Sequence, residues 1–277
     1  MGGDPPGAGD VSEADAVDPP ALLALAVEAA RSAGALLLQR FAAGREPALA
    51  SKSSPTDLVS EADLSSQRAI RALLGQRRPH DGFLGEEAGQ DEPGTSGLRW
   101  VVDPLDGTIN FLFGIPQWCV SVAVGDELGS LVGAIYDPCR DELFTAVRGG
   151  HPECNGVPIS ASGRTELASA MVATGFAYEA DVRAAQARVL TRVVDRVRDV
   201  RRFGSAALDL AWTAAGRYDA YFERTVKPWD IAAGTLVCEA AGLRVAELPV
   251  HPHLPWGILV GSGELVDALL PLAGAAA

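Results

Sequence analysis

Three short apolar segments in the middle of the chain, at residues 120–124, 131–136 and 143–147, constrain the fold most. Turn-forming Asp, Gly and Pro residues separate them, as is typical of strands joined in an antiparallel meander. After about residue 165, predicted strands alternate with predicted helices. The strands are expected at 171–174, at 218–222 and near 245 and 259, and the helices at 181–198, 205–215, 228–241 and after Ser262. A meander followed by such alternation predicts a layered α+β or α/β protein.

Two helices are predicted before the meander. From Ala21 onward, Leu and Ala side chains recur at helical spacing on one wide face, and Gly44 is expected to end this helix. A second helix is expected to begin near Ser60, because Ser60 and Asp63 form the Ser-x-x-Asp pattern of a capping box, and to run through Leu74.

The chain is long enough to fold around its own core. It has 277 residues, of which 48% are hydrophobic, and a chain of this size needs no disulfides or structural metal. Residues 1–20 differ from the rest, with four Gly, four Pro, five acidic residues and no basic one. We therefore expect a disordered acidic tail at 1–20 and a single domain at 21–277, with lobes at about 21–165 and 166–277.

Charge and cysteine usage narrow the class of protein. The net charge of −13 repels a phosphate backbone, so we do not expect nucleic-acid binding through the overall electrostatic field. No uninterrupted run of about 18 apolar residues and no basic leader is found, so neither a membrane span nor secretion is expected. The four cysteines have no framework spacing, which predicts free thiols in the cytoplasm. Arg188, Arg192 and Arg196 are predicted to lie along one helix face, as a solvated or oligomer-facing stripe.

One motif follows a predicted strand and carries two carboxylates, Asp103-Pro104-Leu105-Asp106-Gly107-Thr108. An apolar strand at 100–102 delivers Asp103 to its carboxyl end, where ligands bind in α/β sheets. Pro104 is expected to halt the strand ladder, and Gly107 to permit a sharp turn into a helix at 108–113. Two carboxylates around such a turn can converge on a hard cation, which prefers oxygen ligands. An ordinary Asp-rich turn with a helix cap fits the same residues, so the motif alone leaves both interpretations open.

Other acidic residues occupy similar positions. Glu86 and Glu87 follow an apolar pair at 83–84, and Asp230 lies in the first turn of the helix predicted from residue 228. Asp57 lies in a Ser- and Pro-rich turn. Each has an ordinary explanation, since acids are common in loops, at turns and near helix N-termini.

Taken together, the order and spacing of these acids resemble the signature of the Mg²⁺-dependent, lithium-sensitive phosphatase superfamily. Within it, the chain is similar to the inositol monophosphatase family. The matching segments are Lys52-Ser-Ser-Pro-Thr-Asp57, Gly85-Glu-Glu87, Asp103-Pro-Leu-Asp-Gly-Thr108, Asp219-Ala-Tyr-Phe-Glu223 and Trp229-Asp230. The resemblance runs from about residue 21 to the C-terminus. It implies an αβαβα sandwich of the inositol monophosphatase and fructose-1,6-bisphosphatase type, and a homodimer.

The resemblance also implies a role for each matching residue. A first Mg²⁺ would be held by Glu86, Asp103 and the carbonyl oxygen of Leu105, and a second by Asp103, Asp106 and Asp230. A third, weaker ion would rest on Glu86 and water. Asp57 and Thr108 would orient the attacking water. The expected catalytic residues are thus Asp57, Glu86 and Thr108, and the expected cofactor is two or three Mg²⁺ ions, whose charge would balance the acidic cluster.

The expected substrate is a small phosphate monoester, and inositol monophosphate is the leading candidate. The amides of Gly107 and Thr108 would receive the phosphate, and Glu223 would bind ring hydroxyls. Ser205 and Ala206 would lie beside the ring. The full set implied to contact substrate is Asp106, Gly107, Thr108, Ser205, Ala206, Glu223 and Asp230. Two alternatives stay open: the same chemistry on histidinol phosphate, fructose 1,6-bisphosphate or adenosine bisphosphate, and a regulatory protein of this fold that binds a macromolecular partner.

Overall fold

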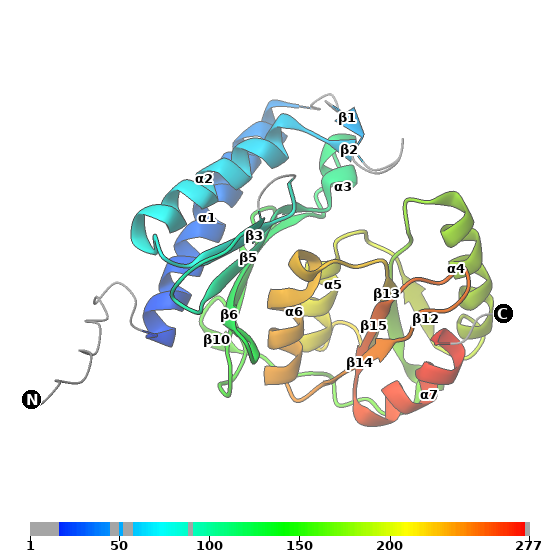
Figure 1. Ribbon diagram of the computed structural model, residues 1–277. Helices are drawn as coiled ribbons and strands as arrows, with labels where there is room; N and C mark the ends of the chain where they lie inside the picture. The colour runs from blue at the N-terminus through cyan, green and yellow to red at the C-terminus, as the bar shows by residue number, and fades with distance from the viewer. Residues whose placement is uncertain (1–16, 45–49, 52–57, 88–90, 275–277) are drawn as a thin grey trace, which may run out of the picture.

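Two β-sheets and three pairs of helices alternate in five layers (Figure 1). The computed structural model describes residues 17–44, 50–51, 58–87 and 91–274. Its helices are α1 (Pro19–Ala43), α2 (Glu61–Arg77), α3 (Thr108–Phe113), α4 (Ala180–Val193), α5 (Ala206–Ala214), α6 (Pro228–Ala240) and α7 (Gly263–Ala273), with a 3₁₀ turn, η2, at Leu167–Ser169. The layer order is α1 and α2, the first sheet, α5 and α6, the second sheet, and α4 and α7. The expected αβαβα sandwich is confirmed.

The first sheet has eight strands in the order β10-β9-β8-β7-β6-β5-β3-β4. Their bounds are β3 Gly82–Gly85, β4 Asp91–Glu92, β5 Arg99–Asp106, β6 Cys119–Asp126, β7 Gly129–Asp137, β8 Glu142–Val147, β9 Glu153–Cys154 and β10 Val157–Pro158. The pairs β6–β7 and β7–β8 are antiparallel, which confirms the predicted meander. Only the β3–β5 pair of this sheet is parallel, so the carboxyl ends of β3 and β5 meet at one edge.

The second sheet has five strands in the order β12-β11-β13-β15-β14. They are β11 Met171–Thr174, β12 Asp199–Arg201, β13 Ala220–Arg224, β14 Arg244–Leu248 and β15 Gly257–Gly261. β11 runs parallel to both β12 and β13, and the remaining pairs are antiparallel. A separate two-stranded hairpin joins β1 (Ala50–Ser51) to β2 (Leu58–Val59).

Helix α1 covers the first sheet from outside. It ends before Gly44 as predicted, and one face of it, which includes Leu22, Leu25 and Leu37, is buried against the sheet. Among the described residues it is the one helix long and apolar enough to cross a membrane, but its buried face packs here as a core helix does. Residues 1–16 of the predicted tail lie outside the described residues. The tail boundary at 20 is too late, because Pro19 and Pro20 form the first turn of α1, where a missing N–H costs little.

The capping box predicted at the start of α2 is present. The Ser60 hydroxyl accepts the backbone N–H groups of Ala62 and Asp63, and the Asp63 carboxylate accepts the backbone N–H of Ser60. Both side chains are fully buried. The cap therefore lies inside the protein, facing the residues that follow β5.

Helix α4 ends earlier than predicted. It stops at Val193 rather than near residue 198, and the chain then turns to form β12. Arg196 is consequently not on the helix, and the Arg192 guanidinium donates to the carbonyl oxygen of Leu272 on α7 at 2.9 Å. The expectation of one arginine stripe along this helix is wrong.

Candidate active site

The end of β5 carries the predicted two-carboxylate motif. The ladder with β6 shifts register between Asp103 and Asp106, because Pro104 has no N–H to donate. The carbonyl oxygen of Pro104 instead accepts the Ser66 hydroxyl at 2.8 Å. Gly107 then has φ +97°, and a Cβ there would lie 2.8 Å from the carbonyl oxygen of Gln117. A glycine is therefore required to turn the chain into α3.

Asp106 joins the first sheet to the central helices. Its buried carboxylate accepts the Ser205 hydroxyl at 2.6 Å, the Ala207 N–H at 2.7 Å and the Ala206 N–H at 3.2 Å, all at the N-terminus of α5. Burial raises the pKa of Asp106, and these three donors act against that rise. The Ser205 and Ala206 donors that the resemblance implies for substrate are thus occupied by Asp106.

Three more carboxylates, those of Glu86, Asp103 and Asp230, lie near one another at the carboxyl end of β5. Burial raises the pKa of Asp103 well above its usual range, and the charges of Glu86, Asp106 and Asp230 add to the rise. Glu86 follows β3, and its N–H donates to the carbonyl oxygen of Val102 in β5. Asp230 lies in the first turn of α6, and its pKa is raised by burial and by Glu86. The sequence-predicted acids of β3, β5 and α6 are therefore within electrostatic reach of each other.

These residues line one cavity of about 690 Å³ between the two sheets. Its wall includes Glu86, Asp103, Leu105, Asp106, Gly107, Thr108, Ala206, Glu223 and Asp230. Within the described residues, no three His, Cys, Asp or Glu side chains stand close enough together to hold an ion as they are. The donor chemistry nevertheless fits a hard cation, since four carboxylates and a carbonyl supply only oxygen. Asp57 and Lys52 lie outside the described residues.

Thr108, the first residue of α3, is buried beside these acids. Its hydroxyl lies 2.8 Å from Asp63 Oδ1 and 3.0 Å from the carbonyl oxygen of Leu105. Sequence reasoning identified Asp63 as a helix cap and missed its contact with Thr108. No sequence signal could have found that contact, because the two residues are 45 positions apart.

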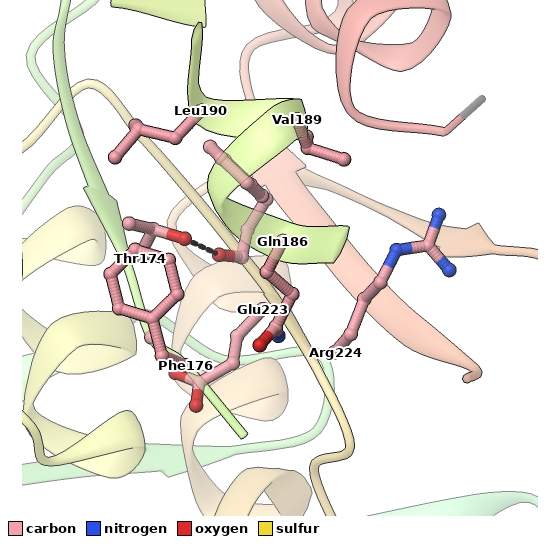
Figure 2. A pocket seen from close by; sticks show the side chains of 9 residues that line it. Thr174, Phe176, Gln186, Val189, Leu190, Glu223 and Arg224 are labelled. Atoms are coloured by element: carbon pink, nitrogen blue, oxygen red, sulfur yellow. Dashed lines mark hydrogen bonds between the residues drawn. The ribbon is translucent and has the colours of Figure 1, made fainter. Parts of the chain in front are cut away.

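Glu223 enters the cavity from the second sheet. Burial raises its pKa to about 7, against the effect of the Tyr221 hydroxyl, which donates to Oε2 at 2.8 Å. Figure 2 shows Glu223 beside Phe176, while the next side chain, Arg224, points to the other side of β13. A Cβ on Gly175, the residue after β11, would lie 2.0 Å from the Glu223 carboxyl group, so a side chain there would have to displace this carboxyl group.

Comparisons with known proteins agree with this geometry. Residues 18–269 match the family model described as the inositol monophosphatase family. The chain is 43% identical over 225 residues to an inositol-1-monophosphatase of Rhizobium meliloti, covering 80% of this chain and 84% of that one. It is 38% identical to a Nus factor SuhB of Pasteurella multocida, covering 88% and 92%. A solved structure, the extragenic suppressor protein suhB of Bartonella henselae, matches with a TM-score of 0.84 and 35% identity over 91% of this chain and 98% of that one. The chain belongs to the inositol monophosphatase family.

Proposed function

We propose that the protein is a Mg²⁺-dependent phosphatase that hydrolyses inositol monophosphate to myo-inositol and phosphate. The observation that carries the proposal is the shared cavity, in which the acids of β3, β5 and α6 face Glu223 of β13. Membership of the inositol monophosphatase family, and the similarity to a relative named for that activity, support the same conclusion.

The electrostatics favour a cation-loaded site. Burial raises the pKa of Asp103 and of Asp230 well above the usual range, and the charge of Glu86 adds to the rise in both. Two or three Mg²⁺ ions would relieve this repulsion, with Leu105 supplying a carbonyl ligand and Asp106 a further carboxylate. When bound, such ions activate water and stabilise the charge that develops during in-line displacement at phosphorus.

The chain's own groups would position the reactants. The amides of Gly107 and Thr108, at the turn into α3, would receive the phosphate. The Thr108 hydroxyl would orient the attacking water, and Glu223 would bind hydroxyls of the inositol ring. A half-buried polar group such as Glu223 disfavours substrates that cannot pair with it, so it would carry much of the discrimination between substrates. Ser205 and Ala206 would act through Asp106, which they hold in place.

A substrate panel tests the proposal. Phosphate release would be measured for D-myo-inositol 1-phosphate, histidinol phosphate, fructose 1,6-bisphosphate and adenosine 3′,5′-bisphosphate, each with Mg²⁺ and with EDTA. We expect Mg²⁺-dependent turnover that favours inositol phosphate by about 100-fold, or about 2.7 kcal/mol. If Mg²⁺-dependent turnover is highest on another substrate, the phosphatase chemistry stands, but the assignment of Glu223 to inositol binding is overturned.

The role of Glu223 has its own test. Glu223→Gln is expected to raise KM for inositol 1-phosphate about tenfold, since a neutral amide pairs less strongly with ring hydroxyls. Turnover of p-nitrophenyl phosphate, which has no ring hydroxyls, should change less than about twofold. Glu247→Gln, an exposed position on β14 of the same sheet, is the matched control. Equal losses on both substrates would contradict the specificity role.

A regulatory role is the second candidate, favoured by the relative named as a Nus factor. If the protein is folded but releases phosphate from no substrate in the panel, the regulatory role is favoured over the phosphatase activity. The homodimer and the cytoplasmic location stay predictions. Sedimentation velocity would decide the first, with a mass near 28.8 kDa indicating a monomer.

A further inference from the structure

Thr225, the residue after β13, has a backbone conformation that its side chain disfavours. Its φ is +70°. The other described non-glycine residues with a positive φ are Asp141, Asn155 and His253, and these three residue types adopt the left-handed region several times more often than the rest. A β-branched residue there is a true outlier, because its side chain crowds the backbone. The fold therefore accepts a free-energy cost at Thr225 that a glycine would avoid.

Contacts on both sides of Thr225 impose this conformation. Arg224, the preceding residue, is buried and projects to the other side of β13 from Glu223 (Figure 2). Its guanidinium donates, at distances of 2.6 to 3.1 Å, to the carbonyl oxygens of Pro249, Pro255, Ala273 and Gly274. The Thr225 N–H donates to the carbonyl oxygen of Trp256 at 2.9 Å. Strain of this kind persists only where the surrounding structure over-determines it, as these five hydrogen bonds do.

The strained residue lies in the wall of the candidate active site. Thr225 is half-buried and lines the same cavity as Glu223, two residues before it, and Trp256, its backbone partner. Its hydroxyl donates to the carbonyl oxygen of Arg224. The hydroxyl proton is thus taken up by the protein, and the lone pairs of Oγ1 stay available as an acceptor for a bound ligand. Strained residues gather at binding sites, where the side chain is used.

We propose that Thr225 is a specificity-determining residue, whose hydroxyl oxygen accepts a hydrogen bond from a substrate hydroxyl beside those that Glu223 binds. The inference rests on the proposed function, because it requires a phosphate ester with several hydroxyl groups. A polyol phosphate can donate to both acceptors, whereas an ester without hydroxyl groups gains nothing from Thr225.

Three substitutions separate the hydroxyl from the backbone strain. Thr225→Val removes the hydroxyl and keeps a β-branched side chain, so KM for D-myo-inositol 1-phosphate should rise about fivefold with kcat changed less than about twofold. Thr225→Ser keeps the hydroxyl, and its KM should stay within about twofold of the wild type. Thr225→Gly removes the hydroxyl and the strain together. Its KM should rise as in Thr225→Val, while its Tm stays at or above that of the wild type.

A second substrate and a second threonine serve as controls. p-Nitrophenyl phosphate has no hydroxyl group on its ring, so its KM should change less than about twofold in all three variants. Thr235→Val removes a hydroxyl that donates to the carbonyl oxygen of Ile231 within α6, at 2.9 Å. This variant should leave the KM of both substrates unchanged.

Several outcomes would overturn the proposal: an unchanged KM for inositol 1-phosphate in Thr225→Val or Thr225→Gly, an equal rise on both substrates, or a Thr225→Gly protein that melts below the wild type. A crystal structure of the wild-type protein with Mg²⁺ and myo-inositol does not depend on the variants folding. We expect one ring hydroxyl within about 3 Å of Thr225 Oγ1, and its absence would also overturn the proposal. A wild-type protein without Mg²⁺-dependent turnover on the substrate panel would instead refute the proposed function, and this inference with it.

Discussion

Glu223 should make the metal-free protein less stable as the pH rises. Its carboxyl group is held in the wall of the cavity, where burial raises its pKa from 4.5 to about 7, and the nearby Asp106 charge adds to the rise. The Tyr221 hydroxyl and the Arg202 charge act in the opposite direction but do not cancel it. The folded chain therefore binds this proton more tightly than the unfolded chain does.

The sign and size of the effect follow from linkage. A raised pKa in the folded state contributes stability that is fully present below pH 4.5 and is lost as the pH rises to about 7. The loss amounts to about 3 kcal/mol for a fully desolvated group, and to about 2 kcal/mol after screening, since Glu223 is partly exposed. Glutamine has no proton to lose and can still accept the Tyr221 hydroxyl. Glu223→Gln should therefore stabilise the metal-free protein at pH 8 by about 2 kcal/mol, or about 4–8 °C in Tm.

Thermal unfolding in EDTA measures this directly. Tm would be recorded at pH 5 and pH 8 for the wild type, Glu223→Gln and the exposed control Glu247→Gln. Tm should rise only for Glu223→Gln, and only at pH 8. The other titrating acids are the same in the wild type and the variant, so their effect on Tm cancels in the comparison. A Glu223→Gln protein no more stable than wild type at pH 8, or equally stabilised at both pH values, would refute the reasoning.

Three further predictions concern the cavity. Asp103→Asn should lower kcat by at least about 100-fold, because Asp103 lies among the carboxylates of Glu86, Asp106 and Asp230. A variant that keeps a tenth of the wild-type rate would contradict this role. Asp81→Asn is the control for the loss of a partly buried acid outside the cavity, since Asp81 accepts the Trp100 Nε1–H at 2.8 Å. Gly107→Ala should lower the free energy of unfolding by about 2–4 kcal/mol, since this position combines a positive φ with a close contact to the carbonyl oxygen of Gln117. Gly129→Ala is the control: its φ is +111° but the space around it is open, so it should cost only about 1–2 kcal/mol. Urea unfolding of both variants measures the difference. Mg²⁺ at about 100 times its Kd should stabilise the protein by about 2.7 kcal/mol at pH 8, and an unchanged Tm would argue against a cation site.

Features that depend on neighbouring residues were predictable from the sequence. The capping box of Ser60 and Asp63, the end of α1 at Gly44 and the turn at Gly107 each use residues within a few positions of one another. The meander was predictable for the same reason, since tight turns join its strands. The order of the acidic motifs indicated the family, and the family resemblance implied the fold.

Where local signals are weak, the prediction failed. Helix α4 was expected to continue to about 198, and nothing in the sequence marks Val193 as its last residue. Tertiary packing decides this end, because the chain must leave the helix to place β12 beside β11 in a parallel pair. Because α4 ends at Val193, Arg196 lies outside the helix and the predicted arginine stripe does not form.

By itself, the sequence identified residues that line the cavity: the acids that follow β3, end β5 and begin α6, together with Thr108 and Glu223. Only the tertiary structure decided how they are partnered. Asp106 accepts donors 99 to 101 residues away at α5, and the Thr108 hydroxyl lies 2.8 Å from Asp63 Oδ1, 45 positions away in the sequence. The physical reason is that burial, charge repulsion and the direction of a hydrogen bond are properties of the assembled cavity. Its wall is built from both sheets and the central helices, and no single segment of the chain contains it.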